Sequence, residues 1–283
     1  MNKRLKILLA ACILLAVLSG CTASYSDAAA QETVSAPASQ PTAAPTPAPT
    51  QELTPEPTLA PTPEPTPVPT TQPTPTPWAA PEGAEVVAEG FYYMPLNDDV
   101  KARITGISYP AEGEECRISY DDLMYIGLKY VDFDGETHAG EMIVNEQLAR
   151  EVTEVFVALF EAEYPLASVR LVSDYGEPHD DNLSMEANNT SAFNYRQITG
   201  SRKLSRHSYG AAIDINPVQN PYIDGDRVAP PNAQDYVDRS LGLPGMIDHD
   251  DLAYRLLTER GWTWGGDWRG DKDYQHFSKD LGF

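Results

Sequence analysis

The chain has 283 residues, enough for one or two domains, and 42 acidic against 20 basic side chains give it a formal net charge of −22. This excess of acid argues against contacts with nucleic-acid phosphates, and we interpret it as a feature that keeps the protein soluble. Three cysteines are too few for a disulfide framework, so we expect an apolar core to hold the fold.

The N-terminus has the pattern of a secretory signal peptide. Lys3, Arg4 and Lys6 precede an apolar run at residues 7–18, which is too short to be interpreted first as a membrane-spanning helix. The sequence Leu-Ser-Gly-Cys, ending at Cys21, is similar to a bacterial lipobox. We therefore predict a signal peptide over residues 1–20 and lipidation of Cys21, which would hold the protein at the outer face of the bacterial membrane. An export signal without lipidation is the alternative.

A proline-rich stretch follows the predicted lipidation site. Sixteen of the 25 prolines lie between Pro37 and Pro81, among repeats such as Thr-Pro-Glu-Pro-Thr. Such a composition cannot form a packed core and favours extended polyproline II structure, whose rise of about 3.1 Å per residue would let sixty residues reach on the order of 150 Å. We predict a disordered stalk over residues 21–83, either a spacer that reaches into the cell wall or a linker without a length requirement.

The third predicted segment, residues 84–283, carries the periodicities of a folded domain. Strand patterns occur at residues 91–107, 128–133 and 141–144, and Asp134-Gly135 is a hairpin signal between the last two. Asn145 is expected to cap a helix whose apolar residues recur at helical spacing from Leu148 to Tyr164.

Fewer regular elements are predicted in the second half of this domain. A strand at residues 169–173 precedes a polar loop at 174–190, and residues 219–245 form a second long loop. Asp248 is expected to cap a short helix that ends at Gly261. Because helices and strands are segregated rather than strictly alternating, we predict an α+β domain, a small antiparallel sheet with flanking helices around a single metal site.

The sequence Ser-Arg-His-Ser-Tyr-Gly-Ala-Ala-Ile-Asp-Ile-Asn at residues 205–216 is the strongest functional signal. Residues 211–216 have the pattern of a short strand in which Ile213 and Ile215 face a core while Asp214 faces a cleft. Gly210 breaks the run before this strand, so His207 can lie beside Asp214. A third metal ligand is available near the C-terminus, where His276 follows a second strand-like segment. Two imidazoles and one carboxylate, with a position left for water, are the ligands of catalytic rather than structural zinc.

These residues resemble the zinc peptidases of bacterial cell-wall peptides, the family of D-alanyl-D-alanine carboxypeptidases and L-alanyl-D-glutamate endopeptidases. The family pattern Ser-x-His-x-x-Gly-x-x-x-Asp is matched by Ser205, His207, Gly210 and Asp214, and its downstream acid-x-x-His-Phe is matched by residues 273–277. The Trp-Gly-Gly-Asp-Trp run from Trp264 to Trp268 favours the endopeptidase-like branch. The resemblance covers residues 90–283 and implies the hedgehog-type zinc fold.

The resemblance also implies roles for residues around the zinc ion. Asp273 would be the base that deprotonates the attacking water, although it must lie at a bend before the strand of His276 to face the same side. Arg196 would bind a substrate carboxylate or the oxyanion, with a structural ion pair as the alternative. Further residues are expected to orient the ligands or to form either the cleft wall or the core: Ser205, Tyr209, Trp264 and Trp268.

Other polar residues are interpreted differently. His138, His179 and His249 are predicted to be surface histidines, although the last two could reach the cleft. Asp267 and Asp271 are substitutes for Asp273 if that assignment fails.

The function predicted from these features is zinc-dependent hydrolysis of peptidoglycan stem peptides, by either an endopeptidase or a carboxypeptidase. We expect the protein to be a monomer. The competing prediction is a wall-binding or signalling module that keeps the zinc fold but has lost catalysis.

Overall fold

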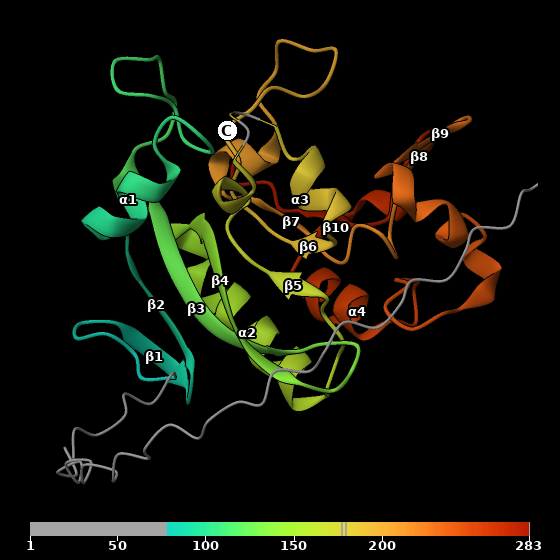
Figure 1. The fold of residues 1–283 in the computed structure, drawn as a ribbon, viewed down its shortest axis with the longest axis horizontal. Helices are drawn as coiled ribbons and strands as arrows, with labels where there is room; N and C mark the ends of the chain where they lie inside the picture. Colours follow the sequence, from blue (N-terminus) through green and yellow to red (C-terminus); the bar gives the residue numbers. More distant parts are fainter. Residues whose placement is uncertain (1–77, 177, 179, 283) are drawn as a thin grey trace, which may run out of the picture. The chain divides into compact units, whose positions relative to one another are not determined.

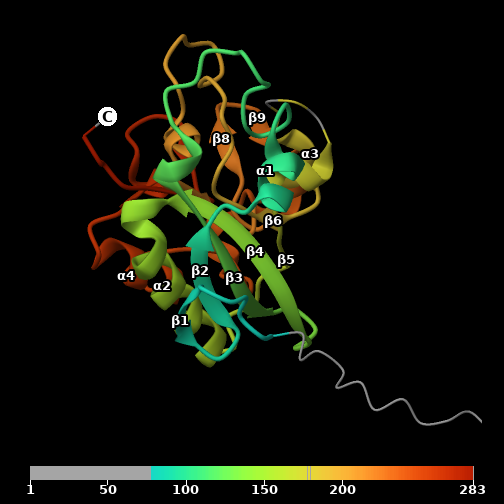
Figure 2. The same ribbon diagram turned by 90° about the vertical axis from the view of Figure 1, so that its left-hand side faces the viewer.

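The computed structural model describes residues 78–282 except 177 and 179, so the predicted signal peptide, Cys21, most of the predicted stalk and His179 lie outside the described residues. Antiparallel strands form three small sheets with helices beside them, which confirms the predicted α+β class (Figures 1 and 2). None of the helices in the described part of the chain has the length and apolar character needed to cross a bilayer.

The largest sheet has the strand order β1-β2-β3-β4, and each neighbouring pair is antiparallel. The β3–β4 hairpin turns at the predicted Asp134-Gly135, where Gly135 has a φ of 83° that a side chain would strain. The four strands are β1 Glu85–Ala88, β2 Phe91–Pro95, β3 Leu123–Val131 and β4 Thr137–Asn145.

The principal helix, α2 (Ala149–Glu161), lies along one face of this sheet (Figures 1 and 2). The Asn145 side chain accepts a hydrogen bond from the backbone of Gln147 at 3.1 Å and so caps the 3-10 turn that precedes the helix, whereas α2 itself begins after Leu148 without a side-chain cap. The turn η2 (Glu146–Leu148) leads into the helix, whose apolar stripe packs on the buried side chains of β3 and β4. The same apolar core contains Ile213 and Phe277, which belong to a second sheet. Burial of apolar surface therefore holds the two sheets together.

That second sheet has the order β10-β12-β7, and the third has the order β11-β8-β9. Strands β5 and β6 form a short parallel pair. The strands are β5 Ser168–Val169, β6 Asn189–Thr190, β7 Ala212–Asp214, β8 Tyr222–Asp224, β9 Arg227–Ala229, β10 Thr263–Trp264, β11 Lys272–Asp273 and β12 His276–Ser278.

Several predicted boundaries are wrong. The strand expected over residues 91–107 ends at Pro95, because the Asn97 side chain accepts from the backbone of Val100 and starts helix α1 (Asp98–Ile104). The strand predicted at 169–173 gives way to the turn η3 (Val172–Tyr175), and the loop predicted at 174–190 contains helix α3 (Asn182–Glu186) and β6.

The last helix, α4 (Leu252–Thr258), is capped by Asp251 instead of the predicted Asp248, since the Asp251 carboxylate accepts from two backbone amides of the first turn. The predicted loop at 219–245 contains the β8–β9 hairpin and two short 3-10 helices. The remaining short helices are η1 Tyr120–Asp122, η4 Arg206–Tyr209, η5 Pro231–Tyr236, η6 Arg239–Leu241 and η7 Gly265–Asp267.

Candidate metal centre

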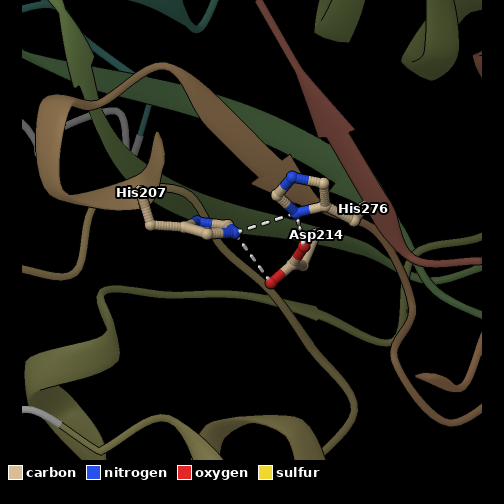
Figure 3. Close-up of side chains that lie close together, drawn as sticks. All are labelled: His207, Asp214 and His276. Atoms are coloured by element: carbon tan, nitrogen blue, oxygen red, sulfur yellow. Dashed lines mark hydrogen bonds and ion pairs between the residues drawn. The ribbon is translucent and has the colours of Figure 1, made fainter. Parts of the chain in front are cut away.

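The predicted ligands His207, Asp214 and His276 converge on one another from two adjacent strands and a helical turn (Figure 3). His276 on β12 is the register partner of Asp214 on β7, and its Nδ1 lies 3.1 Å from Asp214 Oδ1. His207 Nε2 lies 3.2 Å from Asp214 Oδ2 and 3.2 Å from His276 Nδ1. All three residues are buried, so the fold concentrates two imidazoles and one carboxylate in a single enclosed group.

The orientation of His207 follows from its local backbone. It lies in η4, where the Ser205 side chain accepts a hydrogen bond from the His207 backbone amide at 3.3 Å. Its ring Nδ1 is hydrogen-bonded to the carbonyl of Ala192. Because a carbonyl oxygen only accepts, Nδ1 must carry a proton, and in the neutral ring the lone pair of Nε2 then faces Asp214 and His276. This tautomer is the one that binds a metal ion through Nε2.

Gly210 permits the close approach that the His207 turn requires. Its φ is 63°, and a Cβ at this position would lie 2.4 Å from the backbone nitrogen of Asn145. The same Asn145 amide donates to the Gly210 carbonyl at 2.9 Å, which fastens the turn to the end of β4. The glycine of the sequence motif therefore fixes the position of His207 through backbone contact.

Burial and mutual attraction oppose each other in this group. Burial alone would raise the pKa of Asp214, but the charges and hydrogen bonds of His207 and His276 outweigh it and hold that pKa well below its usual range. Burial would likewise lower the pKa of His207, yet the Asp214 carboxylate raises it. A buried carboxylate that stays ionised needs a positive neighbour, so the site has the electrostatics of a cation site.

The donor set fits a metal ion. Its three candidate ligand atoms all lie within 4.8 Å of one another. Two imidazole nitrogens and one carboxylate oxygen suit zinc and similar transition metals and leave coordination positions for water or substrate. The hydrogen bond from His207 to Ala192 supplies the kind of support that metal-bound histidines usually have.

Asp273 lies at the end of β11, where its backbone pairs with Tyr222 of β8, and the turn Tyr274–Gln275 separates it from His276. This turn is the bend that the sequence required. Asp273 is half-buried as a residue, but its Oδ1 is enclosed and has no hydrogen-bond partner among the described residues. Burial raises the pKa of Asp273 to about 6, with the Asp214 charge adding to it and His276 opposing it.

The Trp-Gly-Gly-Asp-Trp run packs against Asp273. A Cβ on Gly265 would lie 2.3 Å from the Asp273 carbonyl oxygen, and one on Gly266 would lie 2.4 Å from the Trp264 ring. Trp264 is buried, donates its indole N–H to the Tyr274 carbonyl at 2.8 Å and stacks on Phe277, so it belongs to the core. Trp268 is 38% exposed with its ring centroid 5.5 Å from that of His276, which places it at the rim of the site.

Arg196 forms an ion pair with Asp181 through Nη2 and Oδ2, and the same Oδ2 accepts a hydrogen bond from Nε at 2.7 Å. The charges of Asp214 and Asp273 also help to raise the pKa of Arg196, in spite of the opposing effect of burial, so its guanidinium acts on the metal group at a distance. The structure thus has the structural ion pair that the sequence left as an alternative. Asp181 was not singled out in the sequence, although it lies in the acidic loop before α3.

The other predicted residues have distinct environments. Tyr209 is half-buried between the two apolar clusters of the domain, and its carbonyl accepts from the side chain of Asn145 at 3.1 Å. His249 is exposed, and its Nε2 lies 2.7 Å from Asp267 Oδ1, so the two side chains form a pair at the surface. Asp271 accepts from the Tyr222 hydroxyl at 2.8 Å.

His138 is also on the surface, 2.6 Å from Asp132 in the β3–β4 hairpin. Ala192 was not predicted to contribute to the site. It orients His207 through its backbone carbonyl, and a backbone contact leaves no signal in the residue type.

Comparisons with known proteins support one family. No curated protein and no solved structure matches the chain significantly. A family model does match, over residues 199–279, which include η4, β7 and β12 and so all three candidate ligands. That model is described as D-alanyl-D-alanine carboxypeptidase, so residues 199–279 are similar to the D-alanyl-D-alanine carboxypeptidase family.

Proposed function

We propose that this protein is a zinc metallopeptidase that hydrolyses peptide bonds in the stem peptides of peptidoglycan. The observation that carries the proposal is the buried convergence of His207, Asp214 and His276 beside the enclosed carboxylate of Asp273, within the matched family segment. Metal-assisted hydrolysis needs a set of residues that holds the metal ion and a separate acidic residue that transfers the proton.

The three ligands would hold zinc through His207 Nε2, His276 Nδ1 and an oxygen of Asp214. When bound there, zinc supplies Lewis acidity that polarises a carbonyl and makes water more acidic. The pairing of β7 with β12 holds two of these donors in fixed register, so little rearrangement is needed for binding.

Asp273 would accept a proton from the attacking water and return it to the leaving amine. Two observations support this role: its Oδ1 is enclosed and lacks a partner in the described part of the chain, and its pKa is raised to about 6. A carboxylate held near that value is a stronger base than an ordinary aspartate and is still ionised at neutral pH. Asp267 and Asp271, the alternatives, are each bonded to another side chain.

Two specificities are compatible with these residues. The description of the family model favours removal of a terminal D-alanine, while the Trp-Gly-Gly-Asp-Trp run favours cleavage between L-alanine and D-glutamate. Digestion of purified peptidoglycan by the zinc-loaded chain, with mass analysis of released fragments, distinguishes them. Loss of D-alanine assigns a carboxypeptidase, and new L-Ala or D-Glu termini assign an endopeptidase. If no wall preparation is cleaved, the proposal is wrong and a zinc-fold binding module takes its place.

We also propose that the protein acts outside the cell, anchored by lipid at Cys21 and held away from the membrane by the stalk. The support is the sequence of residues 1–83, with its apolar run, Leu-Ser-Gly-Cys and proline repeats. Cys21→Ala should abolish labelling by a fatty-acid probe and move the protein from the membrane fraction to the soluble one. Unchanged labelling of this variant would exclude the anchor.

A further inference from the structure

The described part of the chain contains a cavity of about 770 Å³ that none of the three candidate metal ligands lines. Its walls are two loops far apart in the sequence, residues 110–117 and 195–204, which project from the same end of the domain (Figures 1 and 2). A volume of this size accommodates a short peptide.

Hydrogen bonds hold the two walls together. The Tyr195 amide donates to the Ser108 carbonyl at 2.8 Å, and the Tyr195 hydroxyl accepts from the Arg117 amide at 3.1 Å. Within the second loop, the Ile198 amide donates to the Lys203 carbonyl at 2.9 Å and closes a hairpin. These hydrogen bonds fix the two loops relative to each other and so define the shape of the cavity.

The cavity lining is hydrogen-bonded to the turn that carries His207. Arg196 lines the cavity, and its backbone amide donates to the Ser208 hydroxyl at 2.9 Å. The Arg196 carbonyl accepts from the Ser208 hydroxyl at 2.7 Å and from the Ser205 amide at 3.0 Å. Ser205 and Ser208 flank His207 in η4, so hydrogen bonds join the cavity lining at Arg196 to the turn that positions His207.

The charges around the cavity are mixed. Arg117 and Arg202 line it from opposite loops, and within the described residues neither guanidinium forms an ion pair or a side-chain hydrogen bond. Glu114 and Glu115 line it as well, and Glu114 accepts from the Ala111 amide at 2.9 Å. The Arg196 charge is already balanced by Asp181.

This pattern selects the class of ligand. Two guanidiniums without an ion pair in the described part of a chain of net charge −22 attract carboxylates, whereas two carboxylates in the same lining repel a polyanion and attract an ammonium group. We propose that the cavity is an extended substrate subsite for a zwitterionic peptide, whose free carboxylate contacts Arg117 and Arg202 and whose amine contacts Glu115. The inference rests on the proposed function, because it makes this peptide the part of the substrate beyond the scissile bond.

The test measures binding separately from cleavage. The probe is the synthetic stem peptide L-alanyl-D-γ-glutamyl-L-lysyl-D-alanine, titrated calorimetrically into the zinc-loaded full chain carrying Asp273→Asn so that turnover does not interfere. Arg117→Gln and Arg202→Gln should each raise the dissociation constant roughly fivefold, the effect of losing one charge-assisted contact at an exposed site. Lys203→Gln is the matched control, because Lys203 adjoins Arg202 but does not line the cavity, and it should change binding less than twofold.

A second variant tests the amine contact. Glu115→Gln should weaken binding of the stem peptide but not of the same peptide acetylated on both amines. Equal affinities for all cavity variants and the control would overturn the proposal. It would also be overturned if poly(glycerol phosphate) bound as tightly as the peptide and were weakened by the same arginine variants, since that outcome assigns the cavity to an anionic wall polymer.

Cleavage by the chain with Asp273 intact separates this inference from the proposed function. If the peptide binds as predicted but no wall preparation is cleaved, the proposed function fails and the binding site stands. If peptidoglycan is cleaved while the arginine variants leave both peptide binding and KM unchanged, the proposed function stands and the subsite is wrong.

Discussion

His276 and Asp214 are register partners on the adjacent antiparallel strands β12 and β7, with 3.1 Å between Nδ1 and Oδ1. The Asp214 backbone is fixed on its other side by two hydrogen bonds with Ser191, of 2.9 and 3.0 Å. Antiparallel pairing therefore holds the Asp214 backbone from both sides and fixes the point from which its carboxylate projects.

The first prediction concerns the metal. His207→Ala, Asp214→Ala and His276→Ala should each weaken zinc binding by at least about a hundredfold, because a site with two protein ligands is much weaker than one with three. Zinc content after dialysis against a competing chelator is the measurement. His249→Ala serves as the control, since that side chain is exposed and paired with Asp267. Stoichiometric zinc in all three ligand variants would reject the site.

The second prediction separates catalysis from metal binding. Asp273→Asn preserves shape but removes the proton acceptor, so the rate of stem-peptide hydrolysis should fall by about a hundredfold to ten-thousandfold while zinc content is unchanged. Asp271→Asn is the matched control, because that carboxylate accepts from Tyr222 instead of facing the metal group. Wild-type turnover by the zinc-loaded Asp273→Asn enzyme would show that Asp273 is not the base.

The third prediction uses the raised pKa of Asp273, about 6. Because the folded protein retains this proton to higher pH than the unfolded chain, the contribution of Asp273 to stability falls as pH rises from about 4 to about 6 and is then constant. In zinc-free protein, Asp273→Asn should therefore be more stable than wild type at pH 8 by up to about 3 kcal/mol, with a smaller advantage at pH 4.5. Urea unfolding of both proteins at each pH measures the difference. An advantage that is the same at both values would contradict the shift.

The fourth prediction concerns the Arg196–Asp181 ion pair. Arg196→Gln leaves a largely buried carboxylate without its partner and should lower the free energy of unfolding by about 1–3 kcal/mol. Adding Asp181→Asn should recover part of this loss. If Arg196 also binds substrate or the oxyanion, hydrolysis will remain low in the stable double variant; recovery of activity together with stability would assign Arg196 a purely structural role.

The fifth prediction compares two glycines of similar backbone conformation. Gly210→Ala should lower the free energy of unfolding by about 2–4 kcal/mol and also lower zinc affinity, because its Cβ would lie 2.4 Å from Asn145 N and push the His207 turn away. Gly225→Ala, with a φ of 57° and open space around the new Cβ, should cost only the backbone strain of about 1 kcal/mol. Equal losses for the two variants would show that the contact with β4 is unimportant.

Local chemistry in the sequence was sufficient for several parts of this protein. The two histidines and the aspartate were identified because their residue types and spacing match a known ligand pattern, and their convergence follows from strand pairing. The β3–β4 hairpin and the Asn145 cap were predicted because both depend on side chains and turn residues within a few positions of one another. Helix α1 was missed even though Asn97 marks its start, because the β-branched and aromatic residues around it favoured a strand.

Contacts that leave no signal in the residue pattern could be determined only by the tertiary structure. The partner of Arg196, the carbonyl that orients His207 and the approach of Gly265 to Asp273 each join positions between 8 and 15 residues apart. The core position of Trp264 and the rim position of Trp268 were also undecided in the sequence, since both are tryptophans of one short run. The residue types fixed which chemistry is possible, whereas burial and backbone packing decided which of those groups face the site, because exclusion from water depends on the whole fold.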